Sequence, residues 1–314
     1  MHSTTVARSW SALALLCAAT SVLGTADVAQ AALWRDVSDT ALGTPTAGWT
    51  NKVELADING DGLVDLLFAN GGNYNEPGDP TTCGVWINEG PDSSGVPRFA
   101  DRSEAILGEA GGLARVIKAG DLDRNGTTDI VIGHTYETQS RLLLGDGNGG
   151  YVDRTDLLPQ IPASLGDLEL GDVDDDLDLD LVLADWGLDA GSGGLLDPFT
   201  APGGRTMLWR NELADGTLRF TDATATAMPD ALVMWSWELE LVDVEGDFDL
   251  DVMISCKTCT GSFLFRNDGG RFHAQCDRAS SMPTPTAIRT SSSRRSARTK
   301  IVCSSTISPA AVRS

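Results

Sequence analysis

The apolar and polar positions of the chain follow one pattern that occurs four times. In each repeat, a segment of alternating apolar and polar residues leads into a short acidic stretch, and an apolar run rich in β-branched residues follows it. The alternating segments are Val53–Leu55, Val116–Ala119, Leu168–Leu170 and Leu239–Leu241. Alternation at every second residue is typical of a half-buried strand, and short apolar runs bounded by turn residues are typical of buried strands. Each repeat therefore predicts a strand, an acidic loop and a second strand.

A second shared element follows each pair of predicted strands. An apolar run leads into a polar or Gly-rich turn and the chain returns through an aromatic residue, which is typical of a hairpin. The hairpins are expected within residues 85–99, 142–151, 208–220 and 265–272. The acidic stretches start 64, 51 and 71 positions apart, a spacing that suits four-stranded β-propeller blades with variable loops. The predicted fold class is all-β, a β-propeller or part of one, with four blades in residues 32–275.

The N-terminal residues differ from this repeating body. Arg8 precedes a short apolar stretch, and small residues follow that stretch up to Ala31. This is the pattern of a secretory signal, so residues 1–31 are expected to be removed and the mature chain to be secreted, periplasmic or extracellular. No later window is apolar enough to predict an integral membrane segment.

Charge separates the C-terminal residues from the body. The chain has 45 acidic and 23 Lys and Arg residues, a formal net charge of −22. From residue 276 onward one acidic residue stands against seven basic ones, so this tail carries +6 and residues 1–275 carry −28. Because phosphate binding needs basic surface, no nucleic-acid partner is predicted.

Residues 276–314 are rich in Ser and Thr, and two interpretations of them stay open. One is a basic disordered tail. The other is a fifth blade translated in a shifted reading frame. In that frame, each codon joins the third base of one codon to the first two bases of the next. The codons of Met282, Thr284, Thr286, Ile288 and Thr290 begin with AT or AC, so a G before each of them would give Asp in the shifted frame. The third bases in the coding DNA decide between them.

The acidic stretches carry oxygen-bearing side chains at positions 1, 3, 5 and 9, counted from the first Asp; we call them loops 1 to 4 (residues 57–65, 121–129, 172–180 and 243–251). Ca²⁺ takes six to eight oxygen ligands, and one short loop supplies them from alternate residues. Position 7 is expected to add its backbone carbonyl. The predicted calcium ligands are Asp57, Asn59, Asp61, Leu63 and Asp65 in loop 1, Asp121, Asp123, Asn125, Thr127 and Asp129 in loop 2, Asp172, Asp174, Asp176, Asp178 and Asp180 in loop 3, and Asp243, Glu245, Asp247, Asp249 and Asp251 in loop 4.

Two other interpretations of the loops fit the sequence less well. Turns use Asp and Gly without any metal, but four copies at one spacing are hard to explain by turn chemistry alone. An EF-hand needs a bidentate Glu at position 12. The residues at that position are Phe68, Ile132, Leu183 and Ile254, so the EF-hand interpretation fails. Loops 3 and 4 have Leu177 and Phe248 in place of the turn Gly, so we expect them to close with a different geometry or to lose affinity through strain in the turn. Their additional carboxylates are expected to outweigh that loss, so that loops 1 and 2 empty first on progressive chelation.

Loop 1 reads DINGDGLVD and loop 2 reads DLDRNGTTD, and an apolar residue follows each. With loops 3 and 4, residues 34–272 resemble the FG-GAP or VCBS-type repeats of integrin-α-like β-propellers. The resemblance implies a propeller that is stabilised by Ca²⁺, is commonly secreted and serves cell adhesion or ligand binding. The same blades occur in lectin-like proteins and in some polysaccharide lyases, so the resemblance implies no single activity.

The predicted function is a non-enzymatic, calcium-binding scaffold whose partner is an extracellular protein or a carbohydrate. It rests on the loops, the export signal and the lack of a recognisable catalytic set in the sequence. The alternative is a carbohydrate-active protein, either lectin-like or a polysaccharide lyase or hydrolase, in which carboxylates outside the loops such as Asp153 and Glu238 act on sugar.

Weaker signals favour structural roles. Cys256 and Cys259 are expected to form a local disulfide or a packed thiol pair. Cys83 and Cys276 are a further candidate pair, and the sequence does not fix the connectivity. Trp186, Trp235 and Trp237 are expected in the core more than on a sugar-stacking platform. His134 and His273 are expected to be ordinary strand or surface residues.

Overall fold

The structure is a computed structural model that describes residues 35–43, 49–71, 77–108, 111–187, 204–214, 216–229, 232–233, 236–256 and 262–274. The predicted signal at residues 1–31 and the tail at residues 276–314 lie outside the described residues. Within them, no helix is long and apolar enough to cross a membrane.

Each sequence repeat forms one antiparallel sheet in which the strands follow chain order. The first sheet contains β1 (Thr50–Ala56), β2 (Asp65–Asn70), β3 (Gly84–Pro91) and β4 (Pro97–Asp101). The second contains β5 (Ala114–Gly120), β6 (Asp129–His134), β7 (Arg141–Gly145) and β8 (Tyr151–Asp153). The third contains β9 (Leu165–Gly171), β10 (Asp180–Asp185), β11 (Gly204–Asn211) and β12 (Phe220–Asp222), and β13 (Leu232–Val233) pairs with β11. The fourth contains β14 (Ser236–Val242), β15 (Asp251–Cys256), β16 (Phe263–Asn267) and β17 (Phe272–Ala274).

The helical elements are single turns beside the sheets. They are α2 (Ser38–Ala41), α3 (Ser103–Leu107), the 3₁₀ turn η1 (Thr155–Leu157) and α4 (Thr224–Ala227). The prediction of an all-β chain with four repeats is therefore confirmed. The described residues show no closed barrel or propeller.

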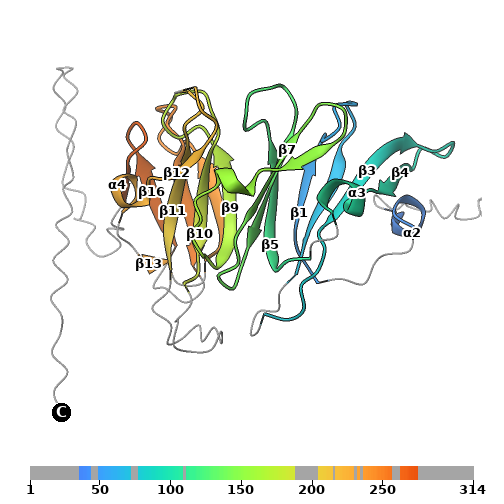
Figure 1. The fold of residues 1–314 in the computed structure, drawn as a ribbon, viewed down its shortest axis with the longest axis horizontal. Helices are drawn as coiled ribbons and strands as arrows, with labels where there is room; N and C mark the ends of the chain where they lie inside the picture. The colour runs from blue at the N-terminus through green and yellow to red at the C-terminus, as the bar shows by residue number, and fades with distance from the viewer. Residues whose placement is uncertain are drawn as a thin grey trace, which may run out of the picture.

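The four sheets stand side by side in chain order (Figure 1), and β1, β5, β9 and β14 are the strands through which neighbouring sheets meet. Three hydrophobic clusters fill the three junctions. At each junction a residue of the second strand shares its cluster with a residue of the next sheet's first strand. The pairs are Leu67 with Ile117, Val131 with Leu168, and Val182 with Leu239. The alternating apolar residues seen in the sequence therefore form the packing between sheets.

Two lysines connect the first strands of different sheets through their ammonium groups. Lys52 of β1 lies 2.5 Å from Asp167 of β9 and 3.3 Å from Glu238 of β14. Lys118 of β5 lies 2.6 Å from Glu169 of β9 and 3.6 Å from Glu54 of β1. The first strands of all four sheets thus share a polar ion-pair network, which the sequence pattern does not predict.

Candidate metal centres

Each acidic loop connects the first and second strands of its sheet, as predicted, and all four loops are wound in the same way. The position 1 carboxylate accepts hydrogen bonds from backbone N–H groups of its own loop, among them that of position 6. These bonds join Asp57 to Gly62 at 2.7 Å, Asp121 to Gly126 at 3.0 Å, Asp172 to Leu177 at 3.0 Å and Asp243 to Phe248 at 2.9 Å. A short acidic side chain therefore closes each turn.

The expectation that loops 3 and 4 close with a different geometry is wrong. Position 6 has a positive φ in every loop: 84° at Gly62, 84° at Gly126, 74° at Leu177 and 76° at Phe248. The same hydrogen bonds require this left-handed backbone, which Gly adopts at no steric cost and Leu or Phe adopts with strain. Loops 3 and 4 keep the shared winding in spite of that strain.

The position 9 carboxylates have a structural role that the sequence analysis missed. Each is fully buried and accepts two backbone hydrogen bonds, one from position 2 of its own loop and one from the third strand of its sheet. The third-strand donors are Asn88 for Asp65 (2.7 Å), Gly145 for Asp129 (2.8 Å), Asn211 for Asp180 (2.9 Å) and Asn267 for Asp251 (2.8 Å). The position 9 carboxylate therefore ties the loop to the sheet. A carboxylate has about four acceptor sites, so the sites that the two N–H groups leave unused remain available to a metal ion.

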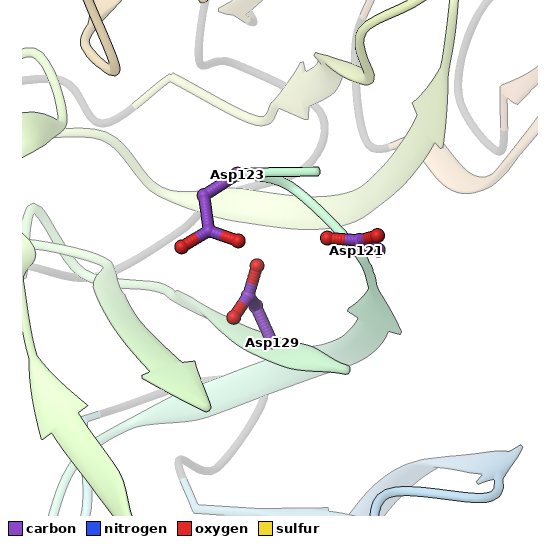
Figure 2. A group of neighbouring side chains, drawn as sticks. All are labelled: Asp121, Asp123 and Asp129. Carbon is purple, nitrogen blue, oxygen red and sulfur yellow. The ribbon is translucent and has the colours of Figure 1, made fainter. Parts of the chain in front are cut away.

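Loops 2 and 3 bring three carboxylates close together. Carboxylate oxygens of Asp121, Asp123 and Asp129 lie within 4.8 Å of one another, and these groups turn toward a common centre (Figure 2). Asp172, Asp174 and Asp176 form the corresponding group in loop 3. Among the described residues, loops 1 and 4 have no group of three carboxylates at this separation.

Burial raises the pKa of carboxyl groups in these two loops. The pKa rises to about 6 at Asp129 and to about 7 at Asp180, chiefly because burial disfavours the charged form. At Asp178 burial, together with the nearby Asp176 carboxylate, raises the pKa to about 6. A cation among these oxygens would favour the charged forms.

Loop 3 contains the clearest requirement for a positive partner. Oδ1 of Asp174 and Oδ1 of Asp178 are buried and have no hydrogen-bond donor. Buried polar atoms are nearly always paired, so such atoms point to an ion or a water molecule. All candidate ligands in the loops are oxygens, the donor type that Ca²⁺ and Mg²⁺ prefer over softer metals. The residues present therefore fit a hard divalent cation.

Arginine side chains partly offset the larger charge of loops 3 and 4. Arg210 of β11 lies 3.2 Å from the Asp174 carboxylate, and Arg266 of β16 lies 3.3 Å from that of Glu245. Each arginine directly precedes the third-strand Asn whose N–H donates to the position 9 carboxylate. The residues that precede the corresponding third-strand donor in the first and second sheets are apolar, namely Ile87 and Leu144. The number of acidic residues alone therefore overstates the difference in charge between the loops.

Position 7, expected to offer only a backbone carbonyl, also uses its side chain. The carboxylate of Asp178 accepts the N–H of Ala214 at 2.8 Å, and that of Asp249 accepts the N–H of Gly269 at 3.0 Å. In loop 2 the hydroxyl of Thr127 lies 3.0 Å from the Gly145 carbonyl. These contacts join the loops to the outer hairpins of their sheets.

Loops 1 and 2 border a small hollow. Its lining includes residues 58–60 and 126–128 and the turn between β7 and β8, and its volume is about 220 Å³. The Tyr151 hydroxyl beside it lies 2.9 Å from the Ile58 carbonyl and 3.0 Å from the Thr128 carbonyl. Sites for drug-sized ligands usually exceed about 300 Å³, so this hollow suits a small polar group at most.

Among the tryptophan and histidine residues with predicted roles, Trp186 and His134 are described in the structure. Trp186 is fully buried, its indole N–H donates to the Ser236 carbonyl at 2.5 Å, and the Arg115 guanidinium lies 4.6 Å from its ring centroid. It therefore belongs to the core. Trp235 and the side chain of Trp237 lie outside the described residues. His134 is buried in β6 with Nδ1 2.7 Å from the Gln139 carbonyl.

The remaining candidates are only partly described. Cys83 is buried, and its candidate partner Cys276 lies outside the described residues, as do Cys259 and the side chain of Cys256. Asp153 pairs with Arg141 at 3.0 Å, while Glu238 pairs with Lys52. Each of these two carboxylates, suggested for sugar chemistry, thus lies beside a basic side chain.

Comparison with known proteins does not place the chain in a family. No protein-family model and no curated protein match the sequence. A solved lectin of Agrocybe aegerita, described as recognising non-reducing terminal N-acetylglucosamine, is 17% identical with a TM-score of 0.43 over 75% of this chain and 55% of that one. The biofilm matrix protein Bap1 of V. cholerae is 18% identical with a TM-score of 0.39 over 72% of this chain and 39% of that one. The chain thus spans about half of the lectin's length and less of the matrix protein's, and similarity this low assigns neither function to it.

Proposed function

We propose that the chain is a secreted, calcium-binding repeat protein of the β-propeller type that acts as an adhesion or ligand-recognition scaffold. The observation that carries the proposal is the acidic loop, which recurs four times with one winding. In loop 3 it leaves buried oxygens of Asp174 and Asp178 without a donor.

Calcium suits these loops for reasons of charge and geometry. The loops offer carboxylate, amide and carbonyl oxygens, and Ca²⁺ accepts six to eight such ligands in irregular arrangements, whereas Mg²⁺ demands a near-ideal octahedron. Unneutralised carboxylates within a few ångströms repel one another. Bound calcium would supply the missing positive charge, while position 9 holds each loop on its sheet.

The position of the loops supports the proposed scaffold role. Loops 1 and 2 contact each other, since the Thr128 hydroxyl of loop 2 donates to the Asp57 carbonyl of loop 1 at 3.0 Å. Ordering the loops would therefore order one shared edge of the molecule for an extracellular protein or carbohydrate. The side-by-side sheets are also the arrangement from which propellers are built.

The metal proposal is tested by calorimetry. An ion that binds only the folded chain stabilises it by mass action, so millimolar calcium should raise the melting temperature above that in chelator. Sodium chloride at equal ionic strength and magnesium serve as comparisons. Asp174→Asn should reduce the calcium effect, whereas Asp153→Asn, which removes the same charge outside the loops, should not. An equal melting temperature in calcium and chelator contradicts the proposal.

Export is tested separately. The chain, expressed with its own N-terminus in a bacterial host, should be recovered outside the cytoplasm. Its mass should match that of a chain whose first residue is Ala32. An intact chain that stays in the cytoplasm would contradict secretion and leave the metal result unaffected.

A further inference from the structure

The first sheet exposes three apolar side chains, and one of them has counterparts that are buried in all three other sheets. Val53, Leu55 and Val64, here called the leading face, are 50%, 61% and 51% exposed. The counterparts of Val53, four residues before each acidic loop, are Ile117, Leu168 and Leu239, and they are at most 1% exposed. Those three are covered because each packs against the preceding sheet.

The fourth sheet also exposes three apolar side chains, on the side that a following sheet covers in the other three sheets. Val242, Val244 and Met253, here called the trailing face, are 43%, 53% and 43% exposed. The counterparts of Met253, at position 11 counted from each first Asp, are Leu67, Val131 and Val182, all fully buried. The counterparts of Val244, at position 2, are Ile58, Leu122 and Val173, exposed by 5% or less. These residues are covered by the following sheet.

The three junctions inside the chain show what covers such faces. In each, the position 11 side chain of one sheet shares a hydrophobic cluster with a first-strand residue of the next sheet. A polar side chain of the next sheet also donates to the position 2 carbonyl. The donors are Tyr151 to Ile58 (2.9 Å), Asn211 to Leu122 (2.8 Å) and Asn267 to Val173 (2.7 Å).

The first sheet has an Asn, Asn88, at the place of the donors Asn211 and Asn267. Nδ2 of Asn88 lies 3.0 Å from the Val64 carbonyl of its own loop, as Nδ2 of Asn267 lies 3.1 Å from that of Leu250. By the pattern of the inner junctions, its other acceptor would be the position 2 carbonyl of a preceding sheet. The fourth sheet presents that carbonyl at the exposed Val244.

We propose that the trailing face of one molecule binds the leading face of a second copy of this chain, head to tail. Met253 then packs on Val53 of the second copy, as Val182 packs on Leu239 within the chain. Asn88 of the second copy donates to the carbonyl of Val244. Because the two faces differ, the contact is heterologous and extends into a ring or an open filament.

One residue makes this junction looser than the inner ones. The position before the loop is Ala56 in the first sheet, Gly120 in the second and Gly171 in the third. A Cβ at Gly171 would lie 2.6 Å from the Leu241 side chain, so nothing larger than Ala stands at this position in the inner junctions. The fourth sheet has Val242 there, opposite Leu55 and Val64 of the second copy. Association is therefore weaker than packing within the chain, and Val242→Gly should strengthen it.

Sedimentation velocity with two variants tests the proposal. The purified chain should associate as its concentration rises, and Val53→Glu and Met253→Glu should each weaken association by about tenfold or more, because a carboxylate would be buried without a partner. Each variant keeps one intact face. An equimolar mixture of the two should therefore form one-to-one dimers that do not grow further.

Several outcomes would overturn the proposal. The proposal is overturned if the parent chain stays monomeric at every concentration. It is also overturned if the single variants associate like the parent, or if the mixture of the two variants stays monomeric. Leu177→Glu is the matched control, because Leu177 is 72% exposed at a loop tip and belongs to neither face. It should associate like the parent, whereas general apolar aggregation would be reduced equally by all three changes. Thermal melting of each variant confirms folding.

Discussion

Leu177 and Phe248 show how strongly position 6 is constrained in the acidic loops. Their side chains are 72% and 88% exposed, so they gain little from burial, yet their backbone has the left-handed conformation that Gly62 and Gly126 adopt freely. A left-handed L-residue costs roughly 1–2 kcal/mol. The loop hydrogen bonds therefore impose the turn on residues that do not favour it.

Replacing either residue by Gly should stabilise the chain. Leu177→Gly and Phe248→Gly should each raise the free energy of unfolding by up to about 1 kcal/mol, because the relieved strain exceeds the entropy that Gly adds to the unfolded chain. Urea denaturation measures the change. Gly126→Ala is the matched control and should lower stability by about 1 kcal/mol. A loss of stability in both Gly variants would mean that the strain is absent.

Three buried carboxyl groups should contribute more to the stability of the metal-free chain in acid than at neutral pH. The pKa values of Asp129, Asp178 and Asp180 are raised to about 6, 6 and 7, above the ordinary value of 3.8 expected in the unfolded chain. The folded chain thus binds protons more tightly, and this stabilisation is complete below about pH 4 and is lost as pH rises through 6 and 7.

Melting in chelator across this pH range measures the effect. The contribution should shrink in Asp180→Asn, which cannot titrate. Calcium needs deprotonated carboxylates, so its stabilising effect should be larger at pH 8 than at about pH 5. A calcium effect that grows on acidification would contradict the assignment of these carboxylates as ligands.

At the scale of an element, the acidic loop combines a structural function with a metal-binding one. Asp129 at position 9 accepts N–H groups of Leu122 and Gly145, at 2.8 Å each, and also lies in the carboxylate group with Asp123. Asp123 at position 3 belongs to that group but makes no such bond to the third strand, so it lacks the structural function.

Two alanine variants should separate these functions. In chelator, Asp129→Ala should lower the free energy of unfolding by about 2–3 kcal/mol, because two buried N–H groups lose their acceptor. Asp123→Ala should leave stability in chelator nearly unchanged and reduce the stabilisation by calcium. Equal losses in chelator for both variants would show that position 9 has no special structural role.

At the scale of the whole molecule, Lys52 connects three sheets through Asp167 and Glu238. Asp167 is fully buried; burial raises its pKa, and the nearby Lys52 opposes that rise. Lys52→Met should lower stability by about 3 kcal/mol, because it leaves a buried carboxylate without its cation. The exposed pair of Arg154 and Asp156 is the control, and Arg154→Met should lower stability much less than Lys52→Met does, because solvent screens an exposed pair. Denaturant unfolding that shows equal effects would argue against the network.

The repeats and their elements could be predicted because their causes are local. Alternation in segments such as Leu168–Leu170, the apolar run after each loop and the turns of the outer hairpins are properties of consecutive residues. The loops could be found for the same reason, since five ligand positions lie within nine residues. Four copies then sufficed to predict an all-β chain.

Tertiary structure decided what depends on residues distant in sequence. Position 9 bonds to donors 16 to 31 residues away, so only the folded sheet shows that it is a structural tie. Loops 3 and 4 keep the Gly-type turn because their hydrogen bonds outweigh the strain at Leu177 and Phe248. Val53 and Ile117 occupy the same place in the pattern, and only the packing of a preceding sheet buries one and leaves the other exposed. The sequence by itself thus determined the repeating unit, while contacts between units decided which side chains are buried, paired or free to bind.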